Sequence, residues 1–295
     1  MPGAVGSRLP VRYAAEDPKK PRPGSLYEVL GGHRAVLVWN SAFHATLMKI
    51  IAIGGGRIGR FSPAVRTTAI DREVVRISGK KSPRLLFLPT ASAGCDQYCA
   101  AIYNQFSKKL GCRVDIMLLV NTDPVYASIR DRVSRADIVY VGEGNTLRMM
   151  KTWRHYGVDR ALRAAMKRGA VLCGSSAGSI AWFSWGNSDS LKSQQDPTRL
   201  VRVRGLGFID ALLCPHYDAE KHRRASLKAM MRKSKRVAIA LDECCAFVVH
   251  DDTYRVLASV KGRKAYRVYW KDGKCVEEEL VPSRQFRPLG PLLAK

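Results

Sequence analysis

The chain has 295 residues, of which 46% are hydrophobic and 25% are charged. This length and composition suit one large globular domain or two small ones and exclude a mostly disordered chain, and the apolar runs are too short for a membrane-spanning helix. The 50 Lys and Arg residues outnumber the 25 Asp and Glu residues and give a net charge of +25, so nucleic acid has to be considered as a partner.

Residues 1–47 differ in composition from the rest of the chain. They hold five of the 14 prolines and several glycines and show no sustained hydrophobic period, which predicts a loosely ordered N-terminal extension. They also lack the charged start, long apolar core and small-residue cleavage site of a signal peptide. The run Met48–Gly56 then predicts a first strand that ends in a glycine turn, and residues 48–295 are predicted to form the main domain.

Short β-branched runs alternate with helical patterns after Met48. Because strands this apolar must be covered on both faces, the fold class is predicted to be α/β, with a mostly parallel sheet and helices on both faces. The predicted strands are Ile50–Ile53, Leu85–Leu88, Val114–Val120, Ile138–Val141, Ala170–Cys173 and Val237–Leu241, and the predicted helices are 96–110, 125–134, 146–156, 158–168 and 177–185.

The C-terminal part changes to an antiparallel pattern. The apolar runs Phe247–Val249, Tyr254–Val260 and Ala265–Trp270 are separated by short turn signals such as Lys271-Asp272-Gly273. We predict antiparallel hairpins that close one edge of the sheet.

Gly174-x-Ser176-x-Gly178 is the strongest chemical signal in the sequence. It follows the predicted strand Ala170–Cys173 and precedes a helical run, which is the context of a nucleophile elbow. Its glycines are needed where a side chain would collide with neighbouring strands. The turn lifts the Ser176 hydroxyl to the carboxyl edge of the sheet, beside a helix N-terminus that favours developing negative charge.

A serine nucleophile needs a base, and His216 is the best placed of the six histidines. It follows the apolar stretch Leu212–Cys214 and a proline, at the end of a strand where open α/β sheets place their active groups. The alternative is a loop histidine held by hydrogen bonds. The other histidines lie in the extension, in helical runs or in a hairpin: His33, His44, His155, His222 and His250.

The base needs an acid that orients it, and two carboxylates qualify. Glu243 comes just after the predicted strand Val237–Leu241, and Asp189 comes just past the predicted elbow helix. Spacing alone does not choose between them.

A second glycine turn, Gly142-Glu143-Gly144-Asn145-Thr146, follows Ile138–Val141. We predict an oxyanion hole formed by the backbone N–H groups of Gly144 and of Ala177. A phosphate-binding loop is the weaker alternative, because no Gly-Lys-Ser/Thr completes a P-loop and Gly54-Gly55-Gly56 lacks a full Gly-x-Gly-x-x-Gly.

Taken together, these motifs resemble the peptidase E family of serine peptidases, which includes aspartyl dipeptidases and cyanophycinases and has the fold of class I glutamine amidotransferases. The resemblance runs from Met48 to about Val249. It implies that Ser176 is the nucleophile, His216 the general base and Glu243 the orienting acid, with Asp189 as a second carboxylate of the active-site region. It also implies dipeptides or short peptides as substrates, with an acidic first residue as a candidate preference.

Glu143 departs from the family pattern, which has glycine in the middle of this turn. A non-Gly residue is strained there if the position needs a positive φ angle, and its carboxylate opposes a nearby oxyanion unless it points to solvent. The departure bears on the strength of the oxyanion hole and on the choice of substrate.

The eight cysteines show no metal-binding or disulfide pattern. None belongs to a Cys-x2-Cys pair, and the adjacent Cys244 and Cys245 are poorly placed to bind one ion. The sequence therefore predicts reduced thiols in a cytoplasmic protein, with no metal and no cofactor.

Two other functions remain as alternatives to a serine peptidase. An α/β-hydrolase esterase fits poorly, because only 40 positions separate Ser176 from His216 and no His-Gly-Gly motif precedes the elbow. A nucleic-acid-binding or scaffold protein of this fold has two supports, Glu143 and the basic run from Lys221 to Arg236. That run has eight Lys and Arg residues, but it also has the pattern of an amphipathic helix with a solvated face. The expected partner is a small peptide and not a membrane, and nucleic acid is the weaker alternative.

Overall fold

The computed structural model describes residues 26–31, 34–39, 48–56, 58 and 65–294. The chain divides into two compact units, Met1–Thr46 and Leu47–Lys295. In the first unit, strands β1 (Leu26–Gly31) and β2 (Arg34–Trp39) form an antiparallel hairpin. These two segments differ from the predicted loose extension, because runs of β-forming residues flank a glycine pair. The rest of that predicted extension lies outside the described residues.

The first sheet of the second unit has strands in the order β16-β13-β12-β3-β7-β6-β4-β5. The five neighbouring strands β3, β7, β6, β4 and β5 are parallel to one another. The remaining strands β12, β13 and β16 pair antiparallel. The parallel strands are β3 (Lys49–Ile53), β7 (Val171–Ser175), β6 (Ile138–Val141), β4 (Arg84–Leu88) and β5 (Arg113–Ile116). The antiparallel strands are β12 (Cys245–His250), β13 (Thr253–Ala258) and β16 (Arg287–Pro288).

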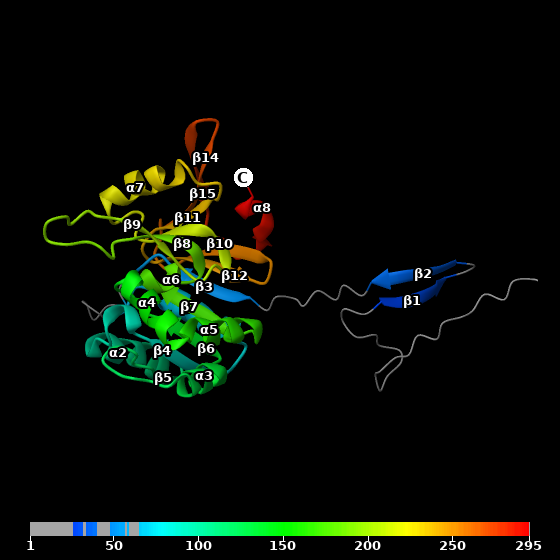
Figure 1. Cartoon of the computed structure of the whole chain (residues 1–295), viewed down its shortest axis with the longest axis horizontal. Coiled ribbons are helices and arrows are strands. Elements are labelled where there is room, and N and C mark those ends of the chain that lie inside the picture. Colours follow the sequence, from blue (N-terminus) through cyan, green and yellow to red (C-terminus); the bar gives the residue numbers. More distant parts are fainter. Residues whose placement is uncertain (1–25, 32–33, 40–47, 57, 59–64, 295) are drawn as a thin grey trace, which may run out of the picture. The chain divides into compact units, whose positions relative to one another are not determined.

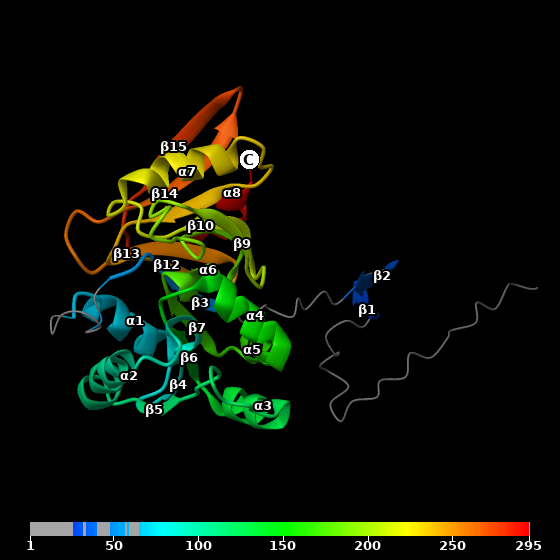
Figure 2. The same cartoon turned by 60° about the vertical axis from the view of Figure 1, so that its left-hand side comes forward.

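Helices cover both faces of the parallel strands (Figure 2). On one face lie α1 (Thr68–Ser78) and α2 (Asp96–Ile102), which continues as the π-helical segment η2 (Tyr103–Lys109). On the other face lie α3 (Tyr126–Arg135), α4 (Thr146–Tyr156), α5 (Val158–Lys167) and α6 (Ala177–Ile180). A short 3-10 turn, η1 (Thr90–Ser92), follows β4, and α8 (Leu289–Leu293) follows β16.

A second sheet has the strand order β15-β14-β11-β10-β8-β9. The central strands β8 (Phe183–Ser188), β10 (Ile209–Cys214) and β11 (Ala238–Leu241) are parallel. Antiparallel strands flank them: β9 (Val201–Arg204), β14 (Ala265–Lys271) and β15 (Lys274–Leu280). Helix α7 (Lys221–Met231) packs on one face of this sheet, and the other face shares its hydrophobic core with the first sheet (Figure 1).

The predicted α/β class, with parallel strands and helices on both faces, is confirmed. Three details were wrong. The hairpin β14–β15 closes a second sheet that the sequence analysis did not predict, whereas β12–β13 does close the first sheet. The predicted helix 177–185 ends at Ile180, because Phe183–Ser188 pairs with β10 and β9, strands that come later in the chain. The strand predicted as Val114–Val120 is shorter, Arg113–Ile116.

Candidate active site

Ser176 lies on a tight turn between β7 and α6, at the carboxyl ends of the parallel strands. Both glycines of the motif are needed for packing: a Cβ on Gly174 would lie 2.3 Å from the carbonyl oxygen of Gly178, and one on Gly178 would lie 2.3 Å from that of Val141 on β6. Ser176 itself has a φ of 51°, a conformation rare for a residue with a side chain. Its N–H donates to the carbonyl oxygen of Ile53 at 3.0 Å, which holds the turn against β3.

A hydrogen-bonded chain of three side chains begins at this serine. Ser176 Oγ lies 2.8 Å from His216 Nε2, and His216 Nδ1 lies 3.1 Å from Glu243 Oε1. With the Nδ1 proton donated to Glu243, Nε2 is free to accept the serine proton, which is the arrangement of a nucleophile, a base and an orienting acid.

The second sheet supplies His216 and Glu243. His216 follows β10 and Glu243 follows β11, and these parallel strands are paired with Cys214 opposite Ala240. His216 and Glu243 therefore both lie at the carboxyl ends of the second sheet's parallel strands. The site forms where these ends meet the carboxyl ends of the first sheet.

The glycine turn after β3 contacts His216 and holds it in position. The His216 N–H donates to the carbonyl oxygen of Gly54 at 2.7 Å, and a Cβ on Gly55 would lie 2.2 Å from His216 Cε1. The N–H of Cys244, next to Glu243, donates to the carbonyl oxygen of Gly55 at 2.7 Å. Sequence reasoning missed this role, because it predicts only a turn after the first strand and an incomplete nucleotide motif at Gly54-Gly55-Gly56.

Asp218 supports the loop that carries Glu243. Its Oδ1 accepts a hydrogen bond from the Glu243 N–H at 2.8 Å, and its other oxygen pairs with Arg263. The sequence offered one signal for this role, the position of Asp218 two residues after His216.

The environment raises the pKa of His216 above its ordinary value of 6.5. Burial of the ring, whose side chain is 16% exposed, acts in the opposite direction and lowers it. The hydrogen bond that His216 donates to Glu243 and the negative charges of Glu143 and Glu243 outweigh burial, because each stabilises the imidazolium.

Asp189 lies apart from this chain of hydrogen bonds. It follows β8, its side chain is 41% exposed, and its Oδ2 lies 4.0 Å from Arg223 Nη2. Arg223 is buried and also binds Glu220 and the carbonyl oxygen of Asn187. The structure therefore brings Ser176, His216 and Glu243 together and places Asp189 beside a buried arginine.

The turn after β6 lies beside the nucleophile turn, since Val141 on β6 pairs with Gly174 on β7. Gly144 has a φ of 134°, and a Cβ there would lie 2.2 Å from the carbonyl oxygen of Ala91, so only glycine fits. Glu143 does not have a positive φ, and the strain considered at this position is absent. Its Oε1 accepts a hydrogen bond of 2.6 Å from Ser175 Oγ.

All eight cysteines are free, and five of them are buried. In the part of the chain that the structure describes, no group of three or more His, Cys, Asp and Glu side chains could hold a metal ion. Within the same part, no helix is both long and apolar enough to span a membrane.

Three of the eight Lys and Arg residues in the basic run Lys221–Arg236 contact other parts of the fold. Arg223 is buried, Arg224 pairs with Glu277 and lies 4.3 Å from the centre of the Tyr217 ring, and Arg236 pairs with Asp210. Helix α7 also buries Leu227 and Met231, as its amphipathic pattern predicts.

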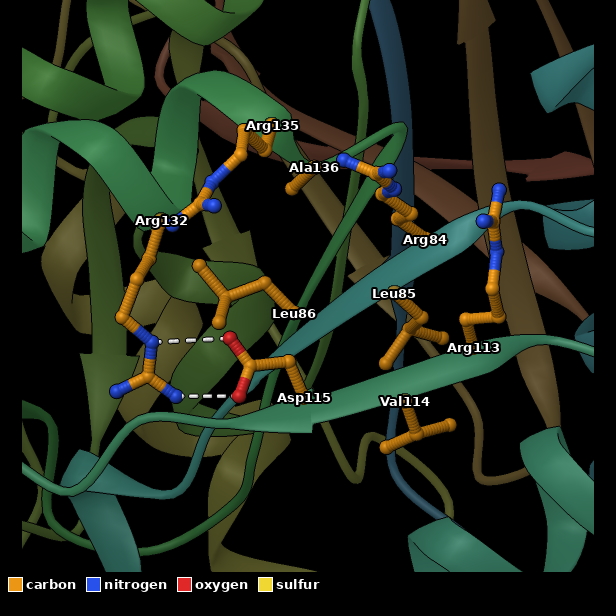
Figure 3. Close-up of a pocket in the computed structure, with 9 residues that line it drawn as sticks. All are labelled: Arg84, Leu85, Leu86, Arg113, Val114, Asp115, Arg132, Arg135 and Ala136. Carbon is orange, nitrogen blue, oxygen red and sulfur yellow. Dashed lines mark hydrogen bonds and ion pairs between the residues drawn. The ribbon is translucent and has the colours of Figure 1, made fainter.

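A cavity of about 360 Å³ lies at the β5 edge of the first sheet, by the amino ends of β4 and β5 (Figure 3). Four arginines line it: Arg84, Arg113, Arg132 and Arg135. It contains no residue of the Ser176, His216 and Glu243 chain and lies at the opposite ends of the strands from them.

Comparison with known proteins gives one family. The model of peptidase family S51 matches residues 50–257. The uncharacterized peptidase YgaJ of Bacillus subtilis is 34% identical over 233 residues, which cover 78% of this chain and 96% of that protein. The uncharacterized peptidase PM1590 of Pasteurella multocida is 24% identical over 184 residues, which cover 60% of this chain and 86% of that protein.

Two solved structures have a similar fold. A peptidase from an acI-B1 Actinobacterium superposes with a TM-score of 0.63 at 17% identity, covering 82% of this chain and 96% of the other. A putative peptidase E protein from Listeria monocytogenes superposes with a TM-score of 0.54 at 15% identity, covering 72% of this chain and 98% of the other.

Proposed function

Because the chain belongs to peptidase family S51 and is a serine-type peptidase, we propose that it hydrolyses dipeptides or short peptides through Ser176, His216 and Glu243. The observation that carries this proposal is the continuous chain from Ser176 Oγ through both nitrogens of His216 to Glu243 Oε1, with steps of 2.8 and 3.1 Å. A preference for an acidic first residue is the finer part of the proposal, and the resemblance to aspartyl dipeptidases supports it.

In the proposed mechanism, Ser176 Oγ attacks the carbonyl carbon of the scissile peptide bond while His216 Nε2 takes its proton. The N–H groups of Gly144 and Ala177 stabilise the oxyanion that forms. The imidazolium then donates its proton to the leaving amine, so the C–N bond breaks and an acyl ester on Ser176 remains. A water molecule deprotonated by His216 hydrolyses this ester and restores the hydroxyl.

The pKa of His216 gives the proposed mechanism a pH dependence. The base has to be neutral, and its pKa is raised above 6.5, so activity is expected to increase as the pH rises through that raised value. Glu243 has two effects in this scheme: it fixes the tautomer and stabilises the imidazolium.

The test of the proposed function is hydrolysis of a dipeptide library by the wild type and by Ser176→Ala, with labelling by a fluorophosphonate probe as a second readout. We expect the wild type to hydrolyse peptides and to be labelled, and the variant to do neither while it unfolds at the same temperature. Normal turnover by Ser176→Ala would show that another residue is the nucleophile.

The same substrates decide between the two candidate acids. In chymotrypsin-type peptidases, replacing the orienting Asp by Asn lowers kcat by about 10⁴. Glu243→Gln is therefore expected to lower kcat by roughly two to four orders of magnitude with little change in KM. Asp189→Asn is expected to cost less, because its side chain lies beside Arg223. An inactive Asp189→Asn together with a nearly normal Glu243→Gln would reverse this assignment.

The cytoplasm is the proposed compartment. The eight free thiols support a reducing environment, since disulfides persist mainly in oxidising compartments.

A further inference from the structure

A second arginine-lined cavity lies at the amino ends of the second sheet's parallel strands. Its volume is about 410 Å³, and residues of α4, α5, the start of β8 and the loop between β9 and β10 bound it. Four arginines and one carboxylate are among the residues that line it: Arg154, Arg163, Arg204, Arg236 and Asp159. His216 and Glu243 follow the carboxyl ends of the same parallel strands, so this cavity is separate from the candidate active site.

Hydrogen bonds hold two of these guanidinium groups against the backbone of the cavity wall. Arg154 Nη2 donates to the carbonyl oxygen of Arg204 at 3.1 Å, and Arg163 Nη2 donates to that of Leu206 at 2.6 Å. A guanidinium group has five N–H donors, so both groups keep donors for a ligand after these bonds. The ion pairs of the described residues include neither Arg154 nor Arg163.

The lining carries more positive charge than neighbouring carboxylates neutralise. Arg236 pairs with Asp210, and when Asp159 is counted as well, two of the four arginine charges stay uncompensated. Burial and the charge of Arg236 also lower the pKa of Arg202, whose guanidinium lies 4.8 Å from the centre of the Trp185 ring in the cavity wall. Because like charges gathered around one cavity repel one another, an anion between them would relieve that repulsion.

The loop between β9 and β10 gives the cavity a preformed wall. The N–H of Leu206 donates to the carbonyl oxygen of Ala181 at 2.7 Å, and that of Gly207 donates to the carbonyl oxygen of Phe183 at 3.1 Å. Gly205 packs so closely that a Cβ there would lie 2.3 Å from the Phe183 carbonyl oxygen. A wall that is already ordered costs little conformational entropy when a ligand binds.

The shape and charge of the cavity define the class of ligand. A volume of 410 Å³ is in the range of small-molecule sites, about 300–1,000 Å³. A single carboxylate would neutralise only one of the two excess charges, whereas a phosphate group carries about 1.5 to 2 negative charges near pH 7. The planar guanidinium fork also fits pairs of phosphate oxygens.

We propose that this cavity binds a small anion of the phosphate class that carries at least two negative charges. Arg154 and Arg163 supply charged hydrogen bonds to it from α4 and α5, and Arg236 contributes charge from the opposite wall. The site does not depend on the proposed peptidase function, because it shares no residue with the chain of Ser176, His216 and Glu243.

The test is calorimetric titration with inorganic pyrophosphate in a background of about 0.15 M chloride, where diffuse surface attraction is screened beyond about 8 Å. We expect the wild type to bind pyrophosphate at one saturable site per chain. Arg154→Gln and Arg163→Gln are each expected to weaken binding about tenfold or more, the usual effect of losing a charged hydrogen bond. Two variants are used because Arg163 also lies 5.2 Å from the centre of the Phe208 ring, and thermal unfolding checks that both are folded.

Three control variants are expected to bind pyrophosphate like the wild type. Arg130→Gln removes the same charge from the exposed side of α3, and Arg84→Gln removes it from the cavity of Figure 3. Ser176→Ala alters the candidate active site and leaves the second arginine-lined cavity intact.

Four results would overturn the inference. The first is the absence of saturable pyrophosphate binding to the wild type. The second is an equal loss of affinity in Arg154→Gln and Arg130→Gln, which would make net charge the cause. The third is a loss in Arg84→Gln or Ser176→Ala alone, which would place the ligand elsewhere. The fourth is binding of a single-stranded oligonucleotide that depends on Arg154 and Arg163 while pyrophosphate does not bind, which would identify nucleic acid as the partner.

Discussion

Gly55 shows how a residue without a side chain positions His216, the proposed base. It has a φ of 116° and packs against the His216 ring, and its carbonyl oxygen accepts the N–H of Cys244 in the loop of Glu243. The space that a side chain would occupy at this position is filled by the imidazole. A base must lie within hydrogen-bonding distance of the proton that it takes. A displaced His216 ring is therefore expected to reduce proton transfer while the protein still folds.

Gly55→Ala is therefore expected to lower kcat by about two orders of magnitude or more, because its Cβ would lie 2.2 Å from His216 Cε1. Gly79→Ala is the matched control: Gly79 ends α1 with a φ of 68°, but a Cβ there meets nothing within 4 Å. Both variants carry the strain of a positive φ, which costs about 1 kcal/mol of stability, and Gly55→Ala should lose more because its Cβ also overlaps the His216 ring. Steady-state kinetics and thermal unfolding of the pair check this, and equal kcat values for the two variants would contradict it.

At the scale of elements, a buried carboxyl group links α1 to η2. Asp71 Oδ2 accepts hydrogen bonds from Thr67 Oγ1 at 3.0 Å and from Gln105 Nε2 at 2.8 Å, and Asp71 is fully buried. Among the described residues, Asp71 Oδ1 and Gln105 Oε1 are buried without a hydrogen-bond partner. Burial raises the pKa of Asp71 from 3.8 to about 7, and its two hydrogen bonds only partly oppose that rise.

This raised pKa makes stability depend on pH. Between pH 3.8 and about 7 the folded protein keeps a proton on Asp71 that the unfolded chain releases. The contribution to stability is therefore complete below pH 3.8, and it decreases as the pH rises until it is lost above about pH 7. Three pKa units correspond to on the order of 4 kcal/mol.

Asp71→Asn removes this titration and is expected to be more stable than the wild type at pH 8 and much closer to it at pH 4.5. Urea unfolding at the two pH values measures the difference. Asp123→Asn, in an exposed loop, is the control and should leave the pH dependence of the wild type unchanged. A stability difference that is the same at both pH values would show that Asp71 does not titrate in this range.

For the whole molecule, the net charge of +25 is the dominant electrostatic feature. Its effect is clearest at the arginine-lined cavity of Figure 3, where Arg132 pairs with Asp115 while Arg84 and Arg113 are direct partners on the parallel strands β4 and β5. Two like charges next to each other on a sheet destabilise it. The edge strand β5 still benefits from its charge, because charged edges resist pairing with other chains.

Arg113→Gln is expected to stabilise the fold at low salt by roughly 0.2–1 kcal/mol, because it removes the repulsion from Arg84. The gain should shrink as salt is raised, since the screening length falls from about 30 Å at 0.01 M to about 3 Å at 1 M. Arg130→Gln on the exposed side of α3 is the control for loss of net charge alone. Thermal unfolding across a salt series is the measurement, and equal salt-dependent gains in both variants would mean that net charge, not the Arg84–Arg113 pair, is responsible.

The sequence by itself determined those parts of the protein whose physics is local. Strand Ile138–Val141 and helix Thr146–Tyr156 have the predicted bounds, because a short apolar run between turn signals and a helical period with an Asn145 cap need no distant partner. The nucleophile turn is also local: Gly174 and Gly178 are required by contacts that the strand-turn-helix unit makes with itself and with the adjacent strand. These features carried the family resemblance and the prediction of the α/β class.

Only the tertiary structure decided the parts that depend on residues far apart in the chain. The composition of Phe183–Ser188 is compatible with a helix or a strand. It forms a strand because β9 and β10 pair with it. The different positions of Glu243 and Asp189 have the same cause. Both follow strands of the second sheet, but the pairing of β10 with β11 directs Glu243 to His216, whereas Asp189 at the end of β8 meets Arg223. Strand order and register are set by long-range hydrogen bonds and shared burial, which no local window of sequence contains.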